Sequence, residues 1–129
     1  MEDDVTVYGE DGSMAKERVS ACMVLYRSGE SAAEAVKCLL DSAPPPHFYL
    51  VDNASGDGVG ERIKAAFPQT ELITLESNIG FGRGNNTVLD RLESDYHLML
   101  NPDVTFPPDL IARMTAYMDA HPDVTILTP

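Results

Sequence analysis

Short apolar runs alternate with amphipathic stretches along most of the chain, and this alternation limits the possible folds more than any other feature. Five runs have the length and aliphatic composition of buried strands, namely residues 19–26, 48–51, 71–75, 96–100 and 125–128. Apolar residues recur at helical spacing in four other segments, which are residues 32–40, 59–67, 85–92 and 108–118. Because strands that alternate with helices pair in parallel, the pattern predicts an α/β protein, a three-layer α/β/α sandwich with a mostly parallel sheet.

The chain is long enough for one domain, and its polar start differs from the rest. It has 129 residues, of which 43% are hydrophobic, enough to form a core. Residues 1–18 contain six acidic and two basic side chains without sustained periodicity, so we expect a flexible acidic leader. The folded part is expected to span residues 19–129. Ser31 and Glu34 have the spacing of a capping box at the start of its first helix.

Charge and cysteine content exclude several classes of protein. Acidic side chains outnumber basic ones by 21 to 9, and a formal charge of -12 opposes binding to nucleic acid and to anionic membrane surfaces. No apolar run approaches the roughly 20 residues of a transmembrane segment, and the acidic start is unlike a signal peptide. Cys22 and Cys38 lie in apolar stretches without metal-ligand spacing. We expect buried free thiols and a cytoplasmic location.

Polar residues follow three of the expected strands, where open parallel sheets bind their ligands. After the second strand come Asp52 and Asn53, and a carboxylate there can accept hydrogen bonds from a base or a ribose. The alternative is a tight turn in which Asp57 caps the next helix.

The second polar segment is rich in glycine. Gly80, Gly82 and Gly84 would let the backbone approach a ligand closely, and Arg83 adds a positive charge. The spacing fits neither a dinucleotide fingerprint nor a P-loop. The alternative is a helix start that packs closely on a strand.

The third polar segment is Asn101-Pro102-Asp103, directly after an apolar strand. A hard divalent cation takes one or two carboxylates together with phosphate oxygens of a substrate, and Asp103 could supply the protein's share. The alternative is an Asx or proline turn that opens the following helix.

The segments VDNASGDG, NIGFGRGNN and LNPDV together resemble the inverting family 2 glycosyltransferases of the GT-A fold, and most closely their rhamnosyltransferase-like branch. The resemblance covers residues 19–129. It implies that Asp52 contacts the base of a nucleotide-sugar donor and that Asp103 holds a divalent metal, Mg²⁺ or Mn²⁺. It further implies that the N-x-G-F loop forms a wall of the donor pocket. The implied nucleotide-binding residues are Tyr26, Asp52, Asn53, Asn78, Gly80, Phe81, Arg83, Asn86 and Asn101.

The resemblance also implies a reaction. A dTDP- or UDP-sugar would donate its sugar, with inversion, to a glycan or lipid-linked acceptor of the cell envelope. The carboxylate base of such enzymes lies after the metal motif, and here only Asp109, Asp119 and Asp123 follow Asp103, all expected on the surface. We therefore expect residues 19–129 to be a truncated, donor-binding part, inactive alone. A truncated sheet would expose an edge, which predicts self-association into homo-oligomers.

Two other classes compete with this interpretation. A response-regulator receiver would use Asp52 as phosphoacceptor, but it needs an acidic pair after the first strand, where Tyr26 and Arg27 stand. The second class is a non-catalytic nucleotide-binding or assembly module of the same fold. The three histidines lack the spacing of a metal site and are expected to be structural.

Overall fold

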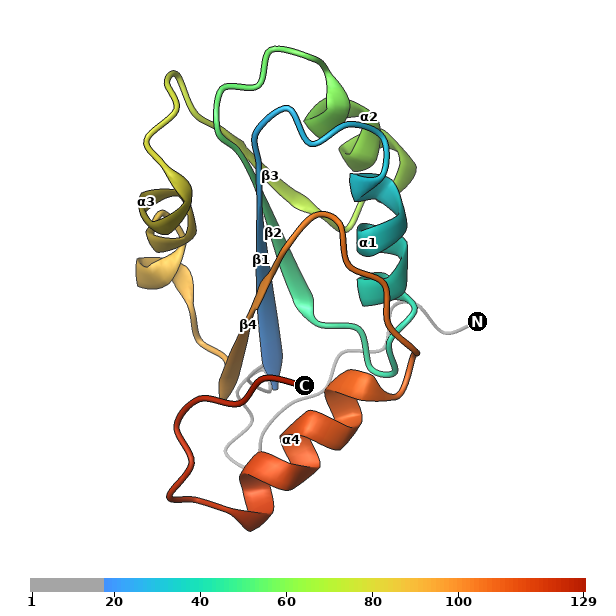
Figure 1. The fold of residues 1–129 in the computed structure, drawn as a ribbon, viewed down its shortest axis with the longest axis vertical. Coiled ribbons are helices and arrows are strands. Elements are labelled where there is room, and N and C mark those ends of the chain that lie inside the picture. Colours follow the sequence, from blue (N-terminus) through green and yellow to red (C-terminus); the bar gives the residue numbers. More distant parts are fainter. Residues whose placement is uncertain (1–17) are drawn as a thin grey trace, which may run out of the picture.

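A computed structural model describes residues 18–129, and these form one parallel sheet with helices on both faces (Figure 1). The strands are β1 (Val19–Leu25), β2 (His47–Asp52), β3 (Glu71–Thr74) and β4 (Tyr96–Leu100). The helices are α1 (Ala32–Leu40), α2 (Val59–Ala66), α3 (Phe81–Asn86) and α4 (Leu110–Ala120), with a 3₁₀ turn η1 (Leu89–Arg91) after α3. The strand order is β3-β2-β1-β4, and each pair is parallel.

The strongly apolar β1 lies in the interior of the sheet and supplies side chains to two cores. Met23 and Leu25 point to the face covered by α1 and α2, whereas Cys22 and Val24 point to the face covered by α3 (Figure 1). Burial on both faces explains why β1, apart from Ser20, is apolar rather than alternating. The predicted three-layer α/β/α sandwich is therefore confirmed.

The segment around α3 corrects the expected helix boundaries. The sequence pattern predicted a helix over residues 85–92, but α3 begins four residues earlier and η1 follows it. Glycine is a poor helix former, so the apolar pattern alone places the helix start after the glycine-rich stretch. Tertiary packing outweighs that preference, because Gly84 is buried against Val24 of β1. The alternative of a helix start packed closely on a strand is thus the correct local description.

The expected fifth strand is absent from the part of the chain that the structure describes. Residues 125–128 form no ladder with β4 and are irregular. They line, with β4 and α4, a largely apolar cavity of about 440 Å³. A short apolar run becomes a strand only where a neighbouring edge pairs with it, and this run finds none among residues 18–129.

The expected capping box is also wrong. Ser31 is the N-cap of α1, but its backbone is already helical and its hydroxyl makes no bond to the helix N–H groups. Instead the hydroxyl donates to the carbonyl of Ser28 at 3.4 Å. The helix start is set by backbone turns from Gly29 and Glu30 rather than by the side chain.

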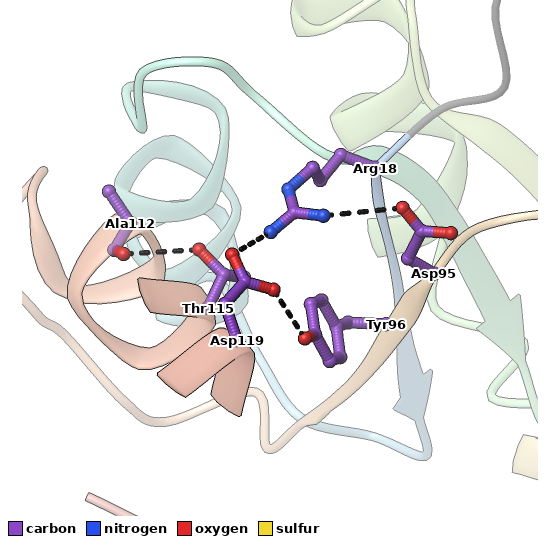
Figure 2. Close-up of polar contacts among 6 residues, drawn as sticks. All are labelled: Arg18, Asp95, Tyr96, Ala112, Thr115 and Asp119. Atoms are coloured by element: carbon purple, nitrogen blue, oxygen red, sulfur yellow. Dashed lines mark hydrogen bonds and ion pairs between the residues drawn. The ribbon is translucent and has the colours of Figure 1, made fainter. Parts of the chain in front are cut away.

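Arg18 anchors the start of β1, and the rest of the expected leader lies outside the described residues. Its carbonyl accepts hydrogen bonds from the backbone N–H groups of Asp95 and Tyr96, both at 3.1 Å. Its guanidinium pairs with the carboxylates of Asp95 and Asp119, and the Tyr96 hydroxyl donates to Asp119 at 2.6 Å (Figure 2). These contacts tie α4 to the amino-terminal end of the sheet. The bonds from Arg18 and Tyr96 lower the pKa of the Asp119 carboxyl.

The cysteines and histidines have structural surroundings. Cys22 is buried and Cys38 half-buried, both as free thiols, and burial raises the pKa of Cys22 to about 11. His97 Nδ1 lies 2.8 Å from the Ser20 hydroxyl on the neighbouring strand. No group of three or more potential metal-ligating side chains occurs within residues 18–129.

Within the same residues, none of the helices has the length and apolar character required to cross a bilayer.

Candidate functional site

The carboxyl ends of β2, β1 and β4 meet at one edge of the sheet. In the register of the sheet, Asp52 at the end of β2 lies beside Leu25, and Leu100 at the end of β4 lies beside Met23. Since β1 separates β2 from β4, the two strand ends are two strand spacings apart, about 10 Å. The backbone therefore brings Asp52 and the Asn101–Asp103 segment to the same edge, on either side of β1.

Asp52 is buried, with 2% of its surface exposed, and one oxygen of its carboxylate accepts a hydrogen bond within the turn after β2. Oδ1 accepts the backbone N–H of Ser55 at 2.9 Å. Oδ2 has no hydrogen-bond partner among the described residues and faces Gly60, where an added Cβ would lie 3.4 Å from it. Asp57 Oδ1 accepts the N–H of Val59, the first residue of α2, at 3.1 Å, but the N-cap residue of this helix is Gly58 rather than Asp57. The turn interpretation is right for both residues, since each accepts a backbone N–H of the segment that follows it, and Asp52 Oδ2 is left without a partner among residues 18–129.

The end of β1 carries an exposed aromatic residue beside strained backbone. Tyr26 is 44% exposed, and the Arg27 guanidinium lies 5.2 Å from the centre of its ring. Arg27 and Ala54 have φ of +50° and +63°, and among the described residues they are the non-glycine residues with positive φ. The Ser55 hydroxyl accepts the Arg27 N–H at 3.0 Å and so joins the two strained turns. Such strain concentrates at functional sites.

Ser55 is a residue of this edge that the sequence interpretation missed. Its backbone N–H binds Asp52 and its hydroxyl binds Arg27, so it connects the ends of β2 and β1. The signal was present in the sequence, because Asp, Asn, Ser and Gly in one short stretch after a strand are typical of a turn whose side chains bond to nearby backbone groups.

The glycine-rich loop before α3 lies against the end of β2. The Asn53 side chain, 2% exposed, donates from Nδ2 to the Gly80 carbonyl at 3.1 Å and accepts the Ile79 N–H on Oδ1 at 2.9 Å. Within the loop, Asn78 Oδ1 accepts the Gly80 N–H at 2.9 Å. Gly80 has φ of +91°, a conformation that requires glycine. Phe81 is 54% exposed at the start of α3.

The remaining loop residues divide between surface and interior. Arg83 and Asn86 are exposed on α3, and Arg83 makes no ion pair with any described acidic residue. Asn85 is buried; its Nδ2 donates to the Phe81 carbonyl at 3.1 Å, and its Oδ1 has no partner among residues 18–129. Asn85 therefore stabilises the first turn of α3, a role that the sequence interpretation did not assign.

Asn101 and Asp103 follow β4 on the surface. Both are exposed, and Asp103 has no ion-pair or hydrogen-bond partner among the described residues. A single open carboxylate does not form an all-protein zinc or calcium site. It does fit a hard divalent cation such as Mg²⁺ or Mn²⁺, which takes its remaining ligands from water and substrate phosphate.

The fold is that of the open parallel α/β proteins, a class whose ligands commonly bind at the carboxyl edge of the sheet, and comparison with known proteins gives the family. The model of glycosyl transferase family 2 matches residues 20–129. The chain therefore belongs to glycosyl transferase family 2. No curated protein matches it significantly.

Solved structures share the fold. A crystal structure of S. aureus TarS 1–349 has a TM-score of 0.72 and 21% identity, and covers 81% of this chain. The same protein in complex with UDP has a TM-score of 0.72 and 20% identity, again over 81% of this chain. The present chain spans 33% of the TarS 1–349 chain, about one third of its length. These likenesses confirm the predicted α/β fold of GT-A type.

Proposed function

We propose that residues 19–129 bind a nucleoside diphosphate sugar with a divalent cation and form the donor-binding part of an inverting glycosyltransferase. The observation that carries this proposal is the position of Asp52 and the Asn101–Asp103 segment on either side of β1 at one edge of the sheet. A span of about 10 Å between strand ends suits a ligand with a nucleoside at one end and a diphosphate at the other. Family membership and the UDP complex of TarS support the same ligand class.

The proposed roles follow from the chemistry of each side chain. Asp52 Oδ2 accepts hydrogen bonds from the base, and the exposed ring of Tyr26 lies beside the nucleoside. The loop with Asn78, Gly80 and Phe81, followed by Arg83 and Asn86, forms the wall of the pocket. Asp103, with Asn101, would hold Mg²⁺ or Mn²⁺, which when bound supplies Lewis-acid stabilisation of the diphosphate leaving group. UDP- and dTDP-sugars fit equally, and a rhamnosyl donor follows from the sequence resemblance alone.

Transfer also needs a carboxylate that removes the proton of the acceptor hydroxyl. Asp119 is engaged by Arg18 and Tyr96 at the amino-terminal end of the sheet, opposite the proposed site (Figure 2). Asp109 and Asp123 are exposed beside α4. We therefore propose donor binding without efficient transfer by these 129 residues, the glycan or lipid-linked acceptor being bound elsewhere.

The same observation favours a second candidate, a non-catalytic nucleotide-binding or assembly module. Both candidates bind the nucleotide, and neither gives efficient transfer by these 129 residues alone. They differ for a longer polypeptide that contains this part together with an acceptor-binding part: release of free nucleoside diphosphate from UDP- or dTDP-sugars is expected from the first candidate and not from the second.

The test is calorimetry and thermal unfolding with uridine, UDP and dTDP, each with and without Mg²⁺ or Mn²⁺. UDP or dTDP at about 100 times its dissociation constant should raise the free energy of unfolding by about 2.7 kcal/mol. Asp52→Asn should weaken the binding of uridine and of UDP to the same extent, because Asp52 is proposed to contact the nucleoside. Asp57→Asn is the matched control, because it removes the same charge from the same turn and the amide oxygen can still accept the Val59 N–H. Wild-type protein that no nucleotide stabilises would overturn the proposal.

A further inference from the structure

Asn53 connects three segments through one buried residue. Its backbone N–H donates to the Leu25 carbonyl at the end of β1, at 2.8 Å. Its side chain takes two consecutive groups of the glycine-rich loop, the Ile79 N–H on Oδ1 and the Gly80 carbonyl on Nδ2. With 2% of its surface exposed, the side chain has both functional groups occupied and turned away from solvent.

We infer that Asn53 is a positioning residue, which sets donor affinity by holding the loop of residues 78–81 against the end of β2 and does not itself touch the donor. This inference rests on the proposed function, and it changes the role that the sequence resemblance gave to Asn53. The amide has a second N–H and a second lone pair to offer, but its residue is 2% exposed, so a direct contact with the nucleotide would require the side chain to turn outward and break at least one of its two loop bonds. A buried polar group that loses its partner is left unsatisfied, and the cost of leaving it so opposes such a change.

The loop depends on this residue because its other bonds do not fix it to the sheet. The Asn78 bond to the Gly80 N–H lies within the loop and only shapes it. The Gly80 carbonyl also accepts the Gly84 N–H at 2.9 Å, the first turn of α3. Residues 76–80 make hydrogen bonds to each other and to α3. Among the described residues, their one hydrogen-bond partner outside the loop and α3 is Asn53. The two side-chain hydrogen bonds of Asn53, which we call the Asn53 tether, therefore hold the loop and the start of α3, where Phe81 is exposed.

The two bonds from the Asn53 side chain to the loop require an amide group at this position. One loop group is a donor and the other an acceptor, 2.9 Å and 3.1 Å from the Asn53 side chain. Asparagine offers a short side chain with one acceptor oxygen and one donor nitrogen, whereas an ionised aspartate offers acceptors alone. Aspartate at this position would place a carboxylate oxygen against the Gly80 carbonyl.

The experiment measures the dissociation constant of UDP in the presence of Mg²⁺ and the exchange rate of the Ile79 amide hydrogen without nucleotide. Asn53→Ala should raise the dissociation constant at least tenfold and accelerate Ile79 exchange. Ile79→Pro leaves the Asn53 side chain in place but removes the backbone N–H that binds to it. This variant should raise the dissociation constant of UDP to a similar degree. Ile79→Ala is the matched control, since it keeps the N–H and should bind UDP as the wild type does. In the double variant the two losses should not add.

The outcomes separate the possible roles. If Ile79→Pro binds UDP normally while Asn53→Ala does not, Asn53 contacts the donor directly and the inference is wrong. If Asn53→Ala binds UDP normally although its Ile79 exchange is accelerated, the loop does not set donor affinity and the inference is also wrong. If Asn53→Ala does not fold, Ile79→Pro at the partly exposed loop position decides the matter alone. Wild-type protein that fails to bind UDP overturns the proposed function, while its Ile79 exchange still reports whether the tether exists.

Discussion

Gly84 of α3 lies directly against Val24 of β1. A Cβ built on Gly84 would meet the two γ-carbons of Val24 at 2.9 Å and 3.2 Å, closer than packed side chains allow. The helix axis can approach the sheet this closely because one residue of its inner face has no side chain. The distance of α3 from the sheet depends on that contact, while Asn53 holds the loop before the helix.

Gly84→Ala should therefore destabilise the protein, although alanine is the better helix former. Overpacking of this kind costs about 1–3 kcal/mol, more than the roughly 1 kcal/mol that helix propensity returns. Urea unfolding measures the change. Gly82→Ala is the matched control, because an added Cβ there has no neighbour within 4 Å, and it should be neutral or stabilising. In a Val24→Ala background the cost of Gly84→Ala should shrink; an unchanged cost would show that the clash is not its cause.

Asp103→Asn should remove the effect of the cation on nucleotide binding. The carboxylate is the proposed protein ligand of Mg²⁺ or Mn²⁺, and the amide lacks its charge. Thermal unfolding with UDP should then give the same midpoint with and without metal, while uridine binding stays at the wild-type level. Asp123→Asn, an equal loss of charge at another exposed position, should keep the metal effect. An Asp103→Asn protein with an undiminished metal response would contradict the assignment.

His97 should make the protein less stable in mild acid. Burial lowers its pKa below the ordinary value of 6.5, so the unfolded chain binds the proton more readily than the folded one. The stabilising contribution is complete above pH 6.5 and is lost as the pH falls from there through the folded pKa. Unfolding free energies of the wild type and His97→Gln should diverge across this range, by at most about 1.4 kcal/mol per pH unit. His121→Gln, exposed after α4, serves as the control. Parallel curves for wild type and His97→Gln would refute the prediction.

The contact between Arg18 and Asp119 should be visible in the titration of the carboxyl. Hydrogen bonds from Arg18 and then Tyr96 lower the pKa of Asp119 in the folded protein. Arg18→Gln should move that pKa back toward its ordinary value, as followed by NMR of the Asp119 side-chain carbonyl. The shift should shrink with added salt in the wild type, since the pair is exposed to solvent. The same pKa in both proteins would show that α4 is held at the sheet by other contacts.

The pattern of apolar residues was sufficient for the layers of the fold. A strand buried on both faces, such as β1, needs apolar residues throughout, and helices that cover one face need a periodic stripe. Both patterns are local, so the first four strands and three of the helices were predicted within a few residues. The motifs VDNASGDG, NIGFGRGNN and LNPDV were sufficient for the family, which is now confirmed. The donor, metal and acceptor remain predictions.

The errors lie where a distant partner decides the local structure. The helix α3 contains Gly82 and Gly84, and the packing of Gly84 on Val24 together with the bond from Asn85 to the Phe81 carbonyl favours a helix that local propensity opposes. Residues 125–128 have strand composition but no edge that pairs with them among the described residues. Ser31 has a capping sequence, but the turns before it already begin the helix.

The sequence by itself determined the order of strands and helices and the residue types at the carboxyl ends of the strands, since both depend on neighbours along the chain. Only the tertiary structure decided that β1 separates Asp52 from Asp103, and that Asn53 faces the loop rather than the open edge. Strand order and side-chain partners are set by packing between segments far apart in the sequence, and no local pattern contains them.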